Sequence, residues 1–185
     1  MSDFTIHTID SAPTESREML VAAKTKFGFV PNLLGELAGA PAALRAYMTL
    51  NDLLSQTSLS PVAQQLVLIS TSMANGCEYC VAAHSAGLKA AGLTDAELDA
   101  VRERQSLRDP KLEALRVFVT SVVESRGSVK QPALQRFLDA GYSREQVLEV
   151  LVGIAMKTLS NYTNHIADTP LDRELEPFAW ESATA

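Results

Sequence analysis

The sequence contains few cysteines and histidines and no long apolar run. Only two cysteines and three histidines are present, and no run of about 20 apolar residues could cross a bilayer. Residues 1–4 lack the basic start of a signal peptide. Lysine and arginine form no cluster, and the net charge is −6, which argues against a nucleic-acid partner. These absences predict a cytoplasmic protein that binds neither membrane nor nucleic acid.

Alternation of apolar and polar residues, the mark of a strand, is also scarce, whereas helix start and stop signals recur. Hydrophobic residues make up 46% of the chain, enough for a packed core. We therefore predict an all-α, single-domain helical bundle over residues 1–185, with a less regular arm (1–13) and tail (170–185). Helices are expected over about residues 14–27, 31–38, from 41, 61–74, 77–91, from 95, 110–124, 132–140 and 144–165.

Local sequence also indicates where several of these helices begin. Ser60 precedes Pro61, a combination typical of an N-cap followed by the first helical residue. Two capping boxes are expected, at residues 94–97 and 143–146. Aligning Ser60 with Ser143 superposes Met73 on Met156, a weak correspondence that leaves open two related helical halves.

Both cysteines lie in one motif, C-x-x-C-x-x-x-H, within residues 77–84. On a helix, Cys77, Cys80 and His84 fall within an arc of about 60° and share one face. That arrangement could form a disulfide, a proton relay or part of a metal site. Zinc prefers four ligands and no fourth cysteine or histidine lies nearby in sequence, so we expect no metal and favour redox chemistry over inert core cysteines.

Redox chemistry of this kind requires a thiolate, and three features of the motif favour one. The cysteines lie in the first turn of the expected helix, where the helix dipole stabilises negative charge. His84 follows Cys80 by four residues and could accept its proton. The neighbouring thiol can donate a hydrogen bond to the thiolate. The second cysteine could then convert a sulfenic acid into a disulfide.

The motif and its flanks resemble the alkylhydroperoxidase D-like branch of the carboxymuconolactone decarboxylase family. The resemblance rests on residues 60–61, 65–74 and 75–84, within the motif core 60–92. Residues 161–165 and 169–172 are similar to the C-terminal signature of its peroxidase-related members.

This resemblance implies an all-α fold assembled as a homo-oligomer, a trimer or a hexamer. We expect no cofactor. It implies reduction of hydroperoxides, with recharging by a lipoyl- or thioredoxin-like dithiol. Carried over to this chain, Cys80 is the peroxidatic residue, Cys77 the resolving residue and His84 part of the proton relay.

The sequence departs from the family at the relay glutamate, where it has Gln65. An amide can orient a water or an imidazole but cannot accept a proton at physiological pH. Another carboxylate could replace it, with Glu78, Glu149 and Asp168 as candidates. His165, near the end of the last helix, is either a second imidazole at the site or a residue interacting with the helix C-terminus.

Two other functions remain open at this point. A carboxymuconolactone-type decarboxylase would not need the cysteine pair. A non-enzymatic redox sensor would use the disulfide to alter a partner interaction, and Gln65 keeps this alternative open.

Overall fold

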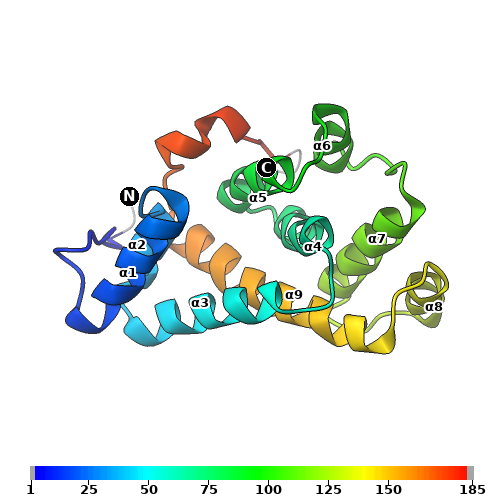
Figure 1. Ribbon diagram of the computed structural model, residues 1–185, viewed down its shortest axis with the longest axis horizontal. Helices are drawn as coiled ribbons and strands as arrows, with labels where there is room; N and C mark the ends of the chain where they lie inside the picture. Colours follow the sequence, from blue (N-terminus) through cyan, green and yellow to red (C-terminus); the bar gives the residue numbers. More distant parts are fainter. Residues whose placement is uncertain (1–2, 183–185) are drawn as a thin grey trace.

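The computed structural model describes residues 3–182, and within that range every regular element is a helix (Figure 1). The predicted all-α class is therefore confirmed. Residues 1–2 of the expected arm and 183–185 of the expected tail lie outside the described residues. The helices are α1 (Thr14–Phe27), α2 (Asn32–Leu37), α3 (Pro41–Ser55), α4 (Pro61–Ala74), α5 (Glu78–Ala90), α6 (Asp95–Arg102), α7 (Pro110–Glu124), α8 (Gln131–Asp139), α9 (Arg144–Ala167) and the short 3₁₀ helix η1 (Arg173–Phe178).

The helices begin where their capping residues predict. The Ser60 hydroxyl accepts a hydrogen bond from the backbone N–H of Ala63, and both expected capping boxes form, at 94–97 and 143–146. These side chains satisfy N–H groups that have no partner inside the helix. The helix ends differ from expectation by one or two residues, and the motif helix starts at Glu78 with Cys77 as its N-cap.

Helix α4 occupies the centre of the bundle, between α5, α7 and α9 (Figure 1). Its residues 66–73 are all buried: five are apolar, and the other three are the hydroxyl residues Ser70, Thr71 and Ser72. Thr71 and Ser72 donate their hydroxyl hydrogens to backbone carbonyls of the preceding turn. Gly153 of α9 faces Val67, and a Cβ at this glycine would lie 2.7 Å from Val67 Cγ1. The glycine therefore allows α9 to approach α4 closely.

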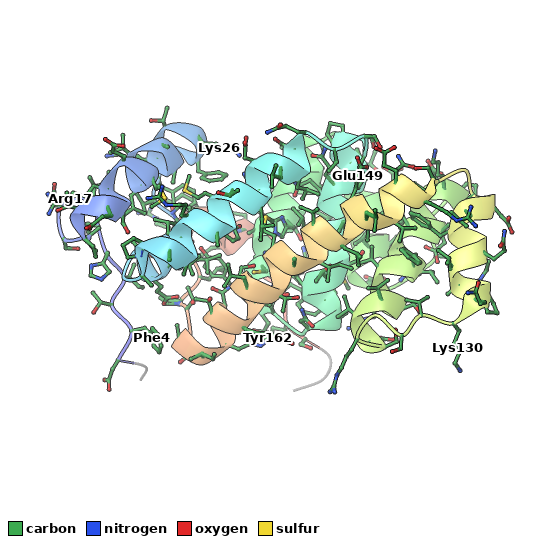
Figure 2. The ribbon with its side chains drawn as sticks, turned by 90° about the horizontal axis from the view of Figure 1, so that it is seen from below. Phe4, Arg17, Lys26, Lys130, Glu149 and Tyr162 are labelled. Carbon is green, nitrogen blue, oxygen red and sulfur yellow. The ribbon has the colours of Figure 1, made fainter. Side chains whose placement is uncertain are left out.

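Helices α3 and α9 lie side by side on one face of the molecule (Figure 2). Helix α9 is 24 residues long and unbroken. Ser60 and Ser143 are both N-caps, as their alignment suggests. The two helices differ in length, however: α4 has 14 residues and ends at Ala74, whereas α9 has 24 residues. Among residues 3–182, no helix is long and apolar enough to cross a membrane.

Helix α5 lies between two hydrophobic clusters. Val81 and Leu88 pack into the larger cluster, formed with α4, α6, α7 and α8. Cys77, Tyr79 and Cys80 pack into the smaller one, formed with α1, α2 and α3. The tail, including η1, crosses over α5, and Trp180 packs against the larger cluster. The motif is thereby enclosed between the tail, α3 and α9.

Candidate active site

The two cysteines form a buried pair at the start of α5. They lie 3.3 Å apart and each side chain is 1% exposed. Gly76, with a φ of +69°, reverses the chain between α4 and α5, a conformation that glycine adopts readily. Cys77 is extended, with φ −89° and ψ 95°, and Cys80 follows in the first helical turn. This geometry brings the two sulfurs together without requiring them to be bonded, and neither cysteine forms a disulfide.

The charged partner of the pair is Lys157, which sequence reasoning did not identify. It is 1% exposed, and its Nζ donates a hydrogen bond of 3.1 Å to Cys80 Sγ. Asn164 Nδ2 donates to both sulfurs, at 3.0 Å to Cys80 and 3.4 Å to Cys77, and Ser160 Oγ lies 3.9 Å from Cys80 Sγ. These residues of α9 recur every three or four positions, so they lie on one face of that helix.

The charges of this cluster distinguish the two cysteines. Burial alone would raise the pKa of Cys80, but the hydrogen bond from Cys77 and the charge of Lys157 hold that pKa well below its usual range. The hydrogen bond to Cys80, together with burial, raises the pKa of Cys77. Burial alone would lower the pKa of Lys157, but the facing thiolate raises it. These shifts all favour a Cys80 thiolate, a Lys157 ammonium and a Cys77 thiol.

His84 is half-buried and hydrogen-bonds Gln65, with 3.0 Å between His84 Nδ1 and Gln65 Oε1. Burial and the charge of Lys157 lower the pKa of His84 well below its usual range, so the imidazole is neutral at neutral pH. Because Gln65 Oε1 accepts, Nδ1 carries the hydrogen and Nε2 remains an acceptor. A Cβ at Gly87 would lie 2.3 Å from Gln65 Oε1, so this glycine makes room for the amide.

A cavity of about 510 Å³ opens beside the pair. Cys80, Lys157, His84 and Gln65 line it, whereas Cys77 does not. The rest of its wall is mainly apolar and aromatic, with contributions from Phe27, Phe29, Leu33, Leu34, Leu68 and Tyr47. Hollows of 570 Å³ beside the tail and 540 Å³ beside α7 and α8 are lined by neither cysteine. Cys80 is therefore the sulfur that a molecule in the cavity would meet.

The other residues singled out in the sequence lie away from the sulfurs. His165 is exposed in the last turn of α9. Glu78 accepts a hydrogen bond from Ser182 N, Glu149 accepts from Ser58, and Asp168 is the exposed C-cap of α9. Within residues 3–182, none of these three carboxylates hydrogen-bonds a thiol.

His84 likewise makes no hydrogen bond to either sulfur in the described part of the chain, although it shares the cavity with Cys80. No group of three or more His, Cys, Asp or Glu side chains placed to hold a metal ion occurs within residues 3–182.

Lys157 could have been found in the sequence from its position in the helical periodicity of α9. The buried face of α9 includes Val150, Gly153, Ser160 and Asn164, all of them uncharged, and a lysine on a buried face is unusual without a charged partner.

The fold and the site together define an all-helical protein with a buried, lysine-paired dithiol. The sequence model of the carboxymuconolactone decarboxylase family matches residues 41–118, from the start of α3 to the middle of α7. This segment is similar to that family, and the described chain has the alkylhydroperoxidase D-like fold. The resemblance inferred from the motif is thus confirmed.

Solved structures with the same fold include enzymes and proteins described only by family. An alkylhydroperoxidase AhpD core, a peroxidase-related protein from Ralstonia eutropha JMP134, is 24% identical over 94% of both chains, with a TM-score of 0.84. A peroxidase-related protein from Silicibacter sp. TM1040 is 17% identical over 94% of both chains, with a TM-score of 0.80. The debrominase Bmp8 is 18% identical over 96% of both chains, with a TM-score of 0.81. A comparison with curated protein sequences found no match.

Proposed function

We propose that this protein is a thiol-dependent peroxidase that reduces hydroperoxides through Cys80 and Cys77. The observation that carries the proposal is the hydrogen bond of 3.1 Å between Lys157 Nζ and Cys80 Sγ on the wall of the cavity. It supports a thiolate at the one cysteine that faces the cavity, with a second thiol 3.3 Å behind it. A peroxide-reducing thiol needs both of these features.

In the first step, the Cys80 thiolate attacks the terminal oxygen of the hydroperoxide. An S–O bond forms and the O–O bond breaks, so sulfur is oxidised and the peroxide is reduced. The leaving alkoxide takes a proton from the Lys157 ammonium and departs as the alcohol. Lys157 thus takes the part of a general acid, which no carboxylate among residues 3–182 is placed to play at these thiols.

In the second step, the Cys77 thiol attacks the sulfenic acid on Cys80. The S–S bond forms, the S–O bond breaks and water leaves. A lipoyl- or thioredoxin-like dithiol entering through the cavity then reduces the disulfide by attacking Cys80, because Cys77 is not accessible from the cavity.

We assign His84 to orienting the bound hydroperoxide through Nε2 and to exchanging protons between Lys157 and solvent. Gln65 is then a positioning residue, because its Oε1 fixes which nitrogen of His84 carries the hydrogen. On this assignment the glutamine does not disable the site, since Lys157 supplies the proton that a carboxylate relay would provide.

The proposal is tested by titrating thiols and recording the intact mass before and after one equivalent of an organic hydroperoxide. We expect loss of two thiols and of two hydrogens, restoration by a dithiol, and continuous turnover when both reagents are supplied. The proposal would be contradicted if both thiols still titrated and the mass were unchanged. Turnover of a carboxymuconolactone substrate would instead favour a decarboxylase. Oxidation without turnover would indicate a redox sensor.

We also propose that the protein is a homo-oligomer that uses the outer face of α9. Leu148, Leu151, Tyr162 and Ile166 are 64%, 41%, 56% and 68% exposed, and their helical spacing puts them on one stripe of this helix. Figure 2 labels Tyr162 on α9. An exposed apolar stripe of this length is typical of a surface covered by another subunit.

We also propose a cytoplasmic location for the protein, because a reduced dithiol at the site fits a reducing compartment.

Introducing charge into this stripe should dissociate the oligomer. We expect the double substitution Leu148→Lys and Ile166→Lys to convert the protein to monomers in sedimentation experiments, because two buried charges per subunit cannot be accommodated in an apolar interface. Val21→Lys is the matched control, since Val21 is 49% exposed on α1, and it should leave the oligomer intact. A monomeric wild type, or an unchanged assembly in the double variant, would rule out this face.

A further inference from the structure

Lys157 has an unusual environment for a lysine. Its Nζ is enclosed in the protein, and its only hydrogen-bond acceptor among residues 3–182 is Cys80 Sγ, at 3.1 Å. No carboxylate within the described chain forms an ion pair with it. The Cys80 thiolate is therefore the main group that stabilises the ammonium against the cost of burial.

Oxidation of Cys80 removes this stabilisation. In the proposed first step the thiolate becomes a neutral sulfenic acid, and the ammonium gives its proton to the departing alkoxide. What remains is a neutral primary amine next to an electrophilic sulfur. Burial keeps the amine neutral because the charged form has lost its partner. A neutral amine is a nucleophile, and the position of its nitrogen makes reaction effectively intramolecular.

We propose that Lys157 is a second resolving group, which captures the oxidised Cys80 as a covalent Cys80–Lys157 sulfenamide. Lys157 Nζ attacks Cys80 Sγ, the S–N bond forms and the S–O bond breaks. The departing hydroxide takes a proton from the nitrogen and leaves as water. No further oxidant is consumed, and a dithiol reduces the S–N bond to return the thiol and the amine. The inference rests on the proposed function, because the hydroperoxide supplies the sulfenic acid.

The structure places this reaction in direct competition with disulfide formation. The Cys77 sulfur and the Lys157 nitrogen are at similar distances from Cys80, 3.3 and 3.1 Å. Because a sulfenic acid that finds no partner is oxidised further and irreversibly, a second partner protects Cys80 whenever Cys77 does not react. The sulfenamide is therefore a reversible protective state of the same site.

The test uses Cys77→Ser, which leaves Cys80 as the sole cysteine, so that no intramolecular disulfide can form. After one equivalent of cumene hydroperoxide, we expect most of the variant to lose two hydrogen atoms in intact mass, and a dithiol to restore them. Tryptic digestion should then join the peptide 46–89, which contains Cys80, to the peptide 145–173, uncut at Lys157. A disulfide between two copies of the chain would be recognised by its doubled mass.

Two double variants provide the controls. Cys77→Ser with Lys157→Met should stop at the gain of one or more oxygen atoms, because no amine is available. Cys77→Ser with Lys24→Met should still lose two hydrogen atoms, because Lys24 is exposed on α1 and does not line the cavity. The wild type provides an independent check, because its peptide mixture should contain some 46–89 joined to 145–173 with Cys77 still open to alkylation.

The outcomes separate the two proposals. A stable gain of oxygen in Cys77→Ser, with no joined peptides in either protein, would overturn the sulfenamide and leave the peroxidase step standing. An unchanged mass in both Cys77→Ser and the wild type would overturn both.

Discussion

Replacing Cys80 by serine should abolish hydroperoxide consumption, with a loss of activity on the order of 10³-fold or more, as expected when a nucleophile is removed. Cys80 is the sulfur on the cavity wall and the one whose pKa is lowered, by Cys77 and Lys157. A serine hydroxyl has neither the acidity nor the nucleophilicity to replace it. The measurement is steady-state consumption of an organic hydroperoxide with a dithiol present.

Cys77→Ser is the matched control, because it makes the same replacement of sulfur by oxygen in the other cysteine of the buried pair. We expect it to consume about one equivalent of hydroperoxide at a rate within about tenfold of the wild type, and then to turn over slowly, since its resolving thiol is missing. Equal and undiminished steady-state activity in both variants would contradict the assignment of the two cysteines. A burst in Cys80→Ser but not in Cys77→Ser would show that the roles are reversed.

Replacing Lys157 by methionine should produce the second large effect. Methionine fills a similar volume but removes both the charge that holds the Cys80 thiolate and the proton given to the alkoxide. Loss of a general acid alone typically costs 10²–10⁴-fold, so we expect the rate of sulfenic acid formation at pH 7 to fall by about that factor. The rate is measured in a single turnover by rapid mixing with hydroperoxide.

The pH dependence distinguishes this electrostatic role from a structural one. The thiolate is the reactive form, so a lowered Cys80 pKa keeps the wild type active as the pH falls below neutrality. In Lys157→Met the Cys80 pKa should rise, and the reaction should accelerate only as the pH approaches the range of an ordinary thiol, about 8.5. Thiolate absorbance followed during the same titration reports that pKa directly.

Lys24→Met provides the control here too, because Lys24 is exposed on α1 and does not line the cavity. It should keep the wild-type rate and pH profile. A Lys157→Met protein that is folded, with an unchanged pH profile, would remove Lys157 from the mechanism.

The helices could be predicted from sequence because their signals are local. Ser60 and the boxes at 94–97 and 143–146 cap the helix ends within three residues of themselves, so their geometry needs no other part of the chain. The motif was also correctly placed at a helix start, and its resemblance to the carboxymuconolactone decarboxylase family is confirmed over residues 41–118.

The charged partner of Cys80 could not be predicted from such local signals. The sequence suggested His84 as the partner of Cys80 because it is four residues away on the same helix, whereas its hydrogen bond in the structure goes to Gln65. The group that touches Cys80 is Lys157, 77 residues further along the chain. Its approach depends on the packing of α9 against α4 and α5, which Gly153 permits.

The amino-acid sequence by itself determined the helical class, the helix starts and the pairing of two cysteines at one helix N-terminus, because each depends on neighbours a few residues apart. Only the tertiary structure decided which cysteine is the thiolate. That choice depends on burial and on a lysine from a distant helix, because the energy of a buried charge is set by whatever groups folding brings within hydrogen-bonding distance.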